Sequence, residues 1–255
     1  NVFPQVYADS VNKKMNEEKK KLKYKARVYT SFPVRNWDHW LDEKQSHAFV
    51  QSLEPGSKAR DIFTDVAIGK LAGFQYTGAA WTGNSVEIVF SASTDFNTGA
   101  YQEQSMHLYK VAVGGGDATK LTSDKFDYYS PQFSDDGKYL LSYTSSNNNY
   151  KVYNDNKLVR FDWPPMQNKT MLAASLDRPI SKYVVQNGVV YMSVEDQGRD
   201  KLFSVAVAGG ATKLISQGTV GCYTNLDISS ESEPTVVSNF ESASMPVEVV
   251  KMKSD

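Results

Sequence analysis

The chain contains two segments, 94 residues apart, that are near copies of each other. "LYKVAVGGGDATKLTS" begins at Leu108, and "LFSVAVAGGATKLIS", which is shorter by one residue, begins at Leu202. Each contains a run of β-type residues, a Gly-Gly pair and a second short run. Because glycine adopts the positive φ angles that tight turns require, each copy predicts a β-hairpin. A duplicated hairpin restricts the fold strongly, since it indicates a structural unit that recurs along the chain.

Other segments rich in Val, Ile, Tyr, Phe and Thr are bounded by turn-forming residues and also predict strands. Their alternation is imperfect and they contain short apolar runs, which favours strands covered on both faces. The clearest are residues 85–93, 138–145, 188–196 and 234–242. Three of them follow turn signals, namely Gly83-Asn84, Asp136-Gly137 and Asn187-Gly188, and the Asp-Gly pair predicts a type I′ turn.

A second strand with a common pattern follows each of these segments after a polar loop. With an earlier member at 47–53, these strands are anchored at His47, His107, Lys157, Lys201 and Val247, in steps of 60, 50, 44 and 46 residues. Repeats of about 40–50 residues built from four short strands are typical of β-propeller blades. An irregular β-sandwich is the alternative, but the duplicated hairpin favours the propeller. We therefore predict an all-β fold in which residues 1–255 form a partial propeller of about four to five blades.

One helix is predicted, over about residues 9–25, where neither Gly nor Pro occurs. Asp9 or Ser10 is expected to cap it, and Val11, Met15 and Leu22 fall on one narrow stripe. The Lys19–Lys21 run could form a phosphate-binding patch, but we interpret it as a solvated helix face.

Composition excludes several classes of function. The chain has 28 Lys and Arg residues against 29 Asp and Glu, a formal charge of -1, which argues against a dedicated nucleic-acid or anionic-membrane binder. Cys222 is the only cysteine, so there is no intramolecular disulfide and no multi-thiolate metal site. No apolar run approaches the roughly 18 residues of a transmembrane helix, and the N-terminus does not resemble a signal peptide.

A family resemblance appears in two places. The unit "SPQFSDDGKYLLSY" is similar to blade sequences of TolB-like and prolyl oligopeptidase-family propellers. More specifically, "VRNWDHWLDEKQSHAFVQSL" (34–53) resembles the Arg-His-Trp-Asp-x-Trp segment of the dipeptidyl-peptidase V and acylaminoacyl-peptidase branch of that family. Asn36 departs from the usual His, and Ala48 departs from the usual Leu. The residues that match the family motif are Arg35, Trp37, Asp38, Trp40 and His47.

The resemblance implies a propeller of roughly seven blades followed by an α/β-hydrolase domain, of which this chain would hold the middle and end of the propeller. The parent protein would be a periplasmic or secreted serine exopeptidase, and the propeller would gate and position short peptides for the absent hydrolase domain. The alternative is a free-standing TolB-like propeller that acts as a protein- or glycan-binding scaffold. In either case we expect an open arc of blades to pair with another copy of the chain or to have altered packing at its ends.

Catalysis by this chain alone is not expected. A serine peptidase of this family needs a G-x-S-x-G nucleophile elbow, and no such pentapeptide occurs. Ser57 and Ser85 follow glycines but lack the second glycine at the required place. We therefore predict no catalytic, cofactor-binding or metal-binding residue, and no cofactor.

Other reactive side chains have ordinary explanations. The three histidines, His39, His47 and His107, lack the spacing of metal ligands and are interpreted as locally hydrogen-bonded. Asp135-Asp136 fits turn chemistry better than a catalytic carboxylate pair. Cys222 has no basic neighbour and reads as a small, partly buried residue. The glycine runs at 114–116 and 209–210 open no helix and form no phosphate cradle, and Asn168-Lys169-Thr170 is a glycosylation sequon.

The Trp37-Asp38-His39-Trp40 cluster is the densest group of functional-looking residues. In an open groove it could stack a sugar or a peptide side chain. The favoured interpretation is structural: the two tryptophans pack between blades, and Arg35 and Asp38 form a partly buried pair.

Overall fold

The computed structural model describes residues 3, 6–29, 32–42, 44–146, 151, 153–216, 218 and 220–253. The chain divides into two compact units. Unit 1 contains Asn1–Ser130 and Ser146–Tyr150, and unit 2 contains Pro131–Ser145 and Lys151–Asp255. Across the described residues, no helix combines the length and the apolar character needed to cross a membrane.

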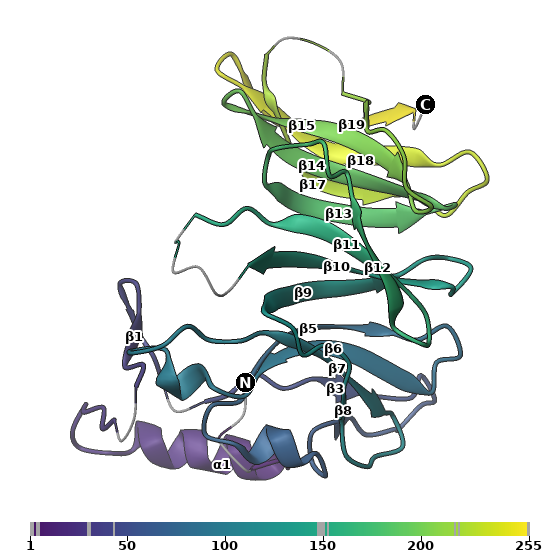
Figure 1. Cartoon of the computed structure of the whole chain (residues 1–255). Coiled ribbons are helices and arrows are strands. Elements are labelled where there is room, and N and C mark those ends of the chain that lie inside the picture. Colours follow the sequence, from purple (N-terminus) through teal and green to yellow (C-terminus); the bar gives the residue numbers. More distant parts are fainter. Residues whose placement is uncertain are drawn as a thin grey trace. The chain divides into compact units, whose positions relative to one another are not determined.

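Unit 1 begins with a helix and a set of very short strands, followed by a four-stranded antiparallel sheet in the order β5-β6-β7-β8 (Figure 1). Two two-stranded sheets, β1-β2 and β3-β4, precede it. The elements are α1 (Asp9–Lys20), β1 (Arg35–Asn36), β2 (His39–Trp40), β3 (Phe49–Val50), β4 (Arg60–Asp61), η1 (Ala67–Lys70), β5 (Gln75–Trp81), β6 (Glu87–Ser93), η2 (Phe96–Thr98), β7 (His107–Ala112), β8 (Thr119–Lys120) and the start of β9 (Phe126–Phe133).

Unit 2 contains the remaining strands, in antiparallel sheets that follow the order of the chain. The orders are β12-β11-β10-β9, β13-β14-β15-β16 and β17-β18-β19. The elements are β10 (Tyr139–Ser146), β11 (Lys157–Asp162), β12 (Gln167–Leu172), β13 (Ile180–Gln186), β14 (Val189–Asp196), β15 (Arg199–Ala206), β16 (Lys213–Leu214), β17 (Cys222–Ile228), β18 (Thr235–Ser242) and β19 (Met245–Lys253).

Each four-stranded sheet is a meander of consecutive strands, which is the construction of a propeller blade. The predicted all-β class with one N-terminal helix is confirmed. The second strand of each blade is buried on both faces, as expected from its apolar runs: β6, β10 and β14 each contain five or more successive buried residues.

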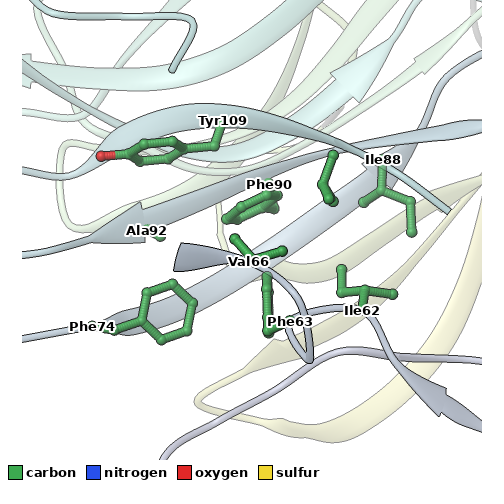
Figure 2. Close-up of a cluster of buried hydrophobic side chains, with 9 residues drawn as sticks. Ile62, Phe63, Val66, Phe74, Ile88, Phe90, Ala92 and Tyr109 are labelled. Carbon is green, nitrogen blue, oxygen red and sulfur yellow. The ribbon is translucent and has the colours of Figure 1, made fainter. Parts of the chain in front are cut away.

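The core of unit 1 is a cluster of aromatic and aliphatic side chains packed on β6 and β7 (Figure 2). The Phe63 ring lies at its centre, 5.0 Å from the ring centroid of Phe74 and 5.1 Å from that of Phe90, with an edge-to-face geometry in both pairs. Phe90 in turn stacks on Tyr109 at 5.6 Å. Such aromatic pairs add about 0.5–1.5 kcal/mol each beyond the buried area, so this cluster holds the loop that contains Phe63 against the sheet.

The helix differs from its prediction in length and in the side it buries. α1 ends at Lys20 rather than near residue 25, and its N-cap is Ala8, without a side-chain cap from Asp9 or Ser10. The expected apolar stripe does not face the core, because Val11 and Leu22 are exposed. Asn12 is buried instead: its Oδ1 accepts the Phe3 backbone N–H at 2.8 Å, and its Nδ2 donates to the Val6 carbonyl.

The three predicted turns form, but the type I′ geometry predicted for Asp136-Gly137 is found at Asn187-Gly188 instead. Asn187 and Gly188 both have positive φ, as a type I′ turn requires. In the Asp136-Gly137 turn only Gly137 has positive φ, so the type I′ prediction was wrong there. The Gly137 N–H donates to the Ser134 carbonyl at 2.8 Å, a tight turn that ends in one left-handed residue.

Candidate functional site

The candidate site is a small exposed β-hairpin in unit 1, formed by Arg35–Trp40 and here called the aromatic hairpin. Arg35 pairs with Trp40 and Asn36 pairs with His39, which leaves Trp37 and Asp38 as a two-residue turn. Trp37 has a φ of +52°, where glycine is preferred. A bulky residue in this left-handed conformation costs roughly 1–2 kcal/mol. Strain of this kind in a surface turn is a reason to look for function in the side chain.

The side chains of the hairpin face solvent. Trp37 is 90% exposed and Trp40 is 55% exposed, although large apolar rings are usually covered. The expectation that these tryptophans pack between blades is not met by the chain as described. Arg35 and Asp38 are exposed as well, which contradicts the expected partly buried pair. The Asp38 carboxylate instead lies 3.3 Å from Nε2 of the neighbouring His39.

The hairpin is attached to the preceding segment through Tyr29. The Tyr29 hydroxyl donates to the Leu41 carbonyl at 2.7 Å, immediately after β2. The Tyr29 ring lies 6.3 Å from the Trp40 ring, tilted by 31°. These two contacts hold Tyr29 beside the hairpin, against the Trp40 ring.

His47, the fifth residue of the family motif, lies in a different environment from the other four. Its Nδ1 is 2.6 Å from Oδ2 of Asp61, and neither side chain has exposed surface. The imidazole packs edge-on against Phe63, with ring centroids 5.4 Å apart, and lies 5.8 Å from the Tyr7 ring. The other carboxylate oxygen of Asp61 accepts the Phe63 backbone N–H at 2.9 Å. The pair therefore links the segment before β3 to the loop after β4.

A histidine hydrogen-bonded to an aspartate occurs in hydrolytic triads, but here both side chains are buried. His47 Nε2 is buried and has no hydrogen-bond partner among the described residues. The Tyr7 hydroxyl is likewise buried without a hydrogen-bond partner among the described residues. Burial raises the pKa of the Tyr7 phenol, and the charges of Asp61 and Asp65 raise it further. The buried pair constrains the packing of the unit 1 core.

The other reactive residues of the sequence occupy structural positions. His107 is buried, with Nδ1 3.3 Å from the Thr122 hydroxyl. Asp136 accepts the Ser134 hydroxyl at 2.7 Å inside its turn, and Cys222 is a partly buried free thiol at the start of β17. Ser85 lies in a turn, and Ser57 donates its hydroxyl to the Ser52 carbonyl. Within the described part of the chain, no three His, Cys, Asp or Glu side chains are grouped to hold a metal ion.

Three residues that complete these environments were missed by sequence reasoning. Asp61 and Tyr7 are brought to His47 only by packing, and Tyr29 is brought to Trp40 by a side-chain hydrogen bond. Asp61 lies in an ordinary "RDIF" run, and no spacing marks it as the partner of a residue 14 positions earlier.

No protein-family model matches the chain, and no curated protein matches it in sequence. Solved structures match its fold. A putative TolB from Agrobacterium tumefaciens aligns with a TM-score of 0.60 at 14% identity, over 82% of this chain and 72% of that one. The propeller domain of the trilobed protease from Pyrococcus furiosus aligns at 0.54 and 20%, over 70% and 52%. An acylaminoacyl peptidase from Pyrococcus horikoshii aligns at 0.55 and 15%, over 92% and 35%.

These similarities show that the fold is that of the propeller domains of TolB and of peptidases. At identities of 20% or less they concern the fold alone. The aligned region spans about half the length of the trilobed-protease propeller chain and about a third of the acylaminoacyl peptidase.

Proposed function

We propose that this chain is a non-catalytic propeller domain that binds short or unfolded peptides and admits them to the active site of a serine exopeptidase of the dipeptidyl or acylaminoacyl type. The observation that carries the proposal is the aromatic hairpin, where Trp37 is held exposed in a conformation that disfavours it. An exposed indole offers a flat apolar surface with one hydrogen-bond donor, which suits the side chains and amides of an extended peptide.

The fold supports this role. The structural similarity to the acylaminoacyl peptidase covers 92% of the chain. The sequence motif at 34–53 also resembles a segment of the propeller in that branch of peptidases. A rigid propeller restricts access sterically and orders the bound peptide, so that the entropy of positioning is lost before the chemical step. The chain itself has no nucleophile elbow, so the hydrolytic residues would belong to a further domain.

The first test is peptide binding to the purified chain, measured by fluorescence anisotropy with labelled unstructured peptides of four to ten residues. We expect saturable binding that falls at least about tenfold in Trp37→Ala and Trp40→Ala, since truncating a tryptophan at the centre of a binding site commonly costs about 2 kcal/mol or more. Tyr101→Ala is the matched control, because Tyr101 is an exposed aromatic residue elsewhere in unit 1. Binding that is unchanged in both tryptophan variants would contradict the proposal.

The second test separates the domain from a complete enzyme. The purified chain should not hydrolyse a dipeptidyl chromogenic substrate. Hydrolysis that persists at constant specific activity through repeated purification would overturn the non-catalytic role.

A TolB-like binding scaffold is the second candidate, because the TolB alignment has a TM-score of 0.60. The two candidates differ in the gene that encodes the chain. The peptidase proposal expects an α/β-hydrolase region with a G-x-S-x-G elbow in the same reading frame, whereas the scaffold expects none. Oligosaccharide binding that is lost in Trp37→Ala would favour the scaffold with a glycan ligand.

A further inference from the structure

The segment that leads into the aromatic hairpin is strongly basic. From Lys19 to Trp37 the chain has seven lysine and arginine residues and no aspartate or glutamate, in a protein whose formal charge is -1. Every residue from Lys19 to Val28 is exposed. The near-neutral balance of the whole chain therefore conceals a local positive surface. The basic residues are Lys19, Lys20, Lys21, Lys23, Lys25, Arg27 and Arg35.

Part of this positive charge lies close to the exposed indoles. Arg35 is the direct cross-strand partner of Trp40. Tyr29 is attached to the hairpin by its hydrogen bond to Leu41 and its ring contact with Trp40. Lys25 and Arg27 are four and two residues before Tyr29, so their backbones lie within about 15 Å and 8 Å of it.

The apolar side chains of the segment are exposed between the basic ones. Leu22 is 47% exposed, Tyr24 65% and Val28 86%; Leu22 and Tyr24 each lie between two lysines in the sequence, and Val28 follows Arg27. A ligand that matches this surface needs carboxylates or other anions at short intervals and aliphatic or aromatic groups between them. Acidic peptides with apolar residues have this composition.

The acidic residues of the hairpin narrow the choice of ligand further. Asp38 is exposed in the turn and Asp42 follows β2, so two carboxylates flank the indoles. A ligand that presents only an unbroken row of phosphates, such as a nucleic acid backbone or an anionic lipid surface, offers no partner to these two carboxylates. A peptide has amide and amino N–H donors as well as carboxylates, and it can satisfy both signs of charge.

We infer that the aromatic hairpin and residues 19–29 together form a binding site for acidic peptides, with apolar side chains on Trp37 and Trp40 and carboxylates paired to Lys25, Arg27 and Arg35. The inference rests on the proposed function and specifies its substrate class. Exposed cations near the site act mainly through long-range attraction, so affinity for acidic peptides falls with ionic strength.

The test compares peptides of one sequence in two forms, with Asp and Glu or with Asn and Gln. At about 50 mM salt we expect the acidic form to bind at least tenfold more tightly, and the difference to shrink as salt screens the charges. The double variant Lys25→Gln, Arg27→Gln should remove most of the preference for the acidic form, leaving the part due to Arg35, without changing the affinity for the amide form. The control is Lys58→Gln, Lys70→Gln, because both lysines are exposed in unit 1 away from the segment in sequence. Equal affinity for the two peptides, or an equal loss in the control, would overturn the inference.

The two levels of the proposal fail in different ways. If both peptide forms bind equally and binding requires Trp37, the acidic preference is wrong and the peptide-binding function stands. If neither form binds, the proposed function fails. Tighter binding of a single-stranded oligonucleotide or of phosphatidylserine vesicles than of the acidic peptide overturns the inference in favour of that ligand.

Trp37→Gly distinguishes loss of binding from loss of folding. Glycine accepts the φ of +52° that the turn requires, so the hairpin should form at least as readily as with tryptophan. We expect unchanged or higher thermal stability together with reduced peptide binding. Retained peptide affinity in this variant would exclude Trp37 as a contact residue.

Discussion

His47 Nδ1 lies 2.6 Å from Asp61 Oδ2, and neither side chain has any surface exposed to solvent. The bond joins two segments that are 14 residues apart, and Asp61 also fixes the backbone of Phe63 at the centre of the unit 1 core. The histidine of the motif is thus an internal brace, while the tryptophans of the same motif face solvent.

Removing one partner of this pair should destabilise the protein strongly. His47→Ala leaves the Asp61 carboxylate buried without its neighbour, and losses of about 3–5 kcal/mol are typical of such changes. Urea denaturation followed by tryptophan fluorescence measures the change. Asp38→Asn is the control, because its contact with His39 is exposed and such pairs contribute only about 0–1 kcal/mol. Equal losses in the two variants would rule out the bracing role.

His107 should make stability depend on pH. Burial lowers its pKa below the ordinary 6.5, and the Lys120 charge lowers it further. The unfolded chain then binds this proton more readily than the folded one, so the free energy of unfolding decreases as pH falls below about 6.5. His107→Gln removes this contribution and should flatten the profile between pH 7.5 and 5.5 in denaturant titrations. A variant profile parallel to the wild type would show that His107 does not titrate in this range.

In both copies of the duplicated hairpin, a side-chain hydroxyl that accepts a backbone N–H should contribute to stability. Thr122 Oγ1 accepts the Leu108 N–H at 3.0 Å, and Ser216 Oγ accepts the Leu202 N–H at 3.1 Å. Both hydrogen bonds are buried, so Thr122→Val and Ser216→Ala should each cost about 1–3 kcal/mol of unfolding free energy.

Ser123→Ala is the informative control for this pair. Alignment by sequence similarity matches Ser123 with Ser216, yet Ser123 is exposed. Its removal should therefore change stability by less than about 0.5 kcal/mol in the same denaturation assay. A larger loss for Ser123→Ala than for Thr122→Val would mean that the sequence alignment describes the hairpins better than their hydrogen bonds do.

Asp196 should contribute to stability at neutral pH and lose this contribution in acid. Its carboxylate lies 2.6 Å from Lys201 Nζ and 3.0 Å from Arg178 Nε, and hydrogen bonds from Lys201 and then Arg178 lower its pKa below the ordinary 3.8. A depressed pKa means that the stabilisation is present above about pH 4 and disappears as pH falls through the folded value. Asp196→Asn should therefore lower the melting temperature at pH 7 and have a smaller effect at pH 3. Glu195→Gln, which changes an exposed neighbour, is the control, and an equal effect of Asp196→Asn at both pH values would contradict this reading.

Sequence patterns located the strands well. Residues 85–93, 138–145, 188–196 and 234–242 all contain strands within two residues of the predicted bounds. A strand is a local object, since apolar runs and turn-forming residues act over a few positions. The helix end was harder to predict, because the helix stops at Lys20 and Leu22, which was expected on its apolar stripe, is about half exposed.

The same distinction explains the site. The motif residues Arg35 to Trp40 were identifiable as a group, but their exposure and the buried position of His47 were not. Burial depends on which segments come together, and Tyr7 and Asp61 reach His47 through contacts that leave no local pattern.

The duplicated hairpin illustrates both levels. From sequence alone, the repeat and its glycine turn establish that the chain is built from recurring β-units. The residue inserted in the first copy predicts that equivalent residues after the turn are shifted by one position. In the structure the offset stays at 94: Leu121 and Ile215 both donate to the leucine carbonyl at the start of their hairpin, and Thr122 and Ser216 both cap its N–H. Side-chain similarity places the gap where residue types match. The folded chain has no gap up to this position, because the buried leucine N–H needs an acceptor and the hydroxyl of Thr122 or Ser216 supplies it.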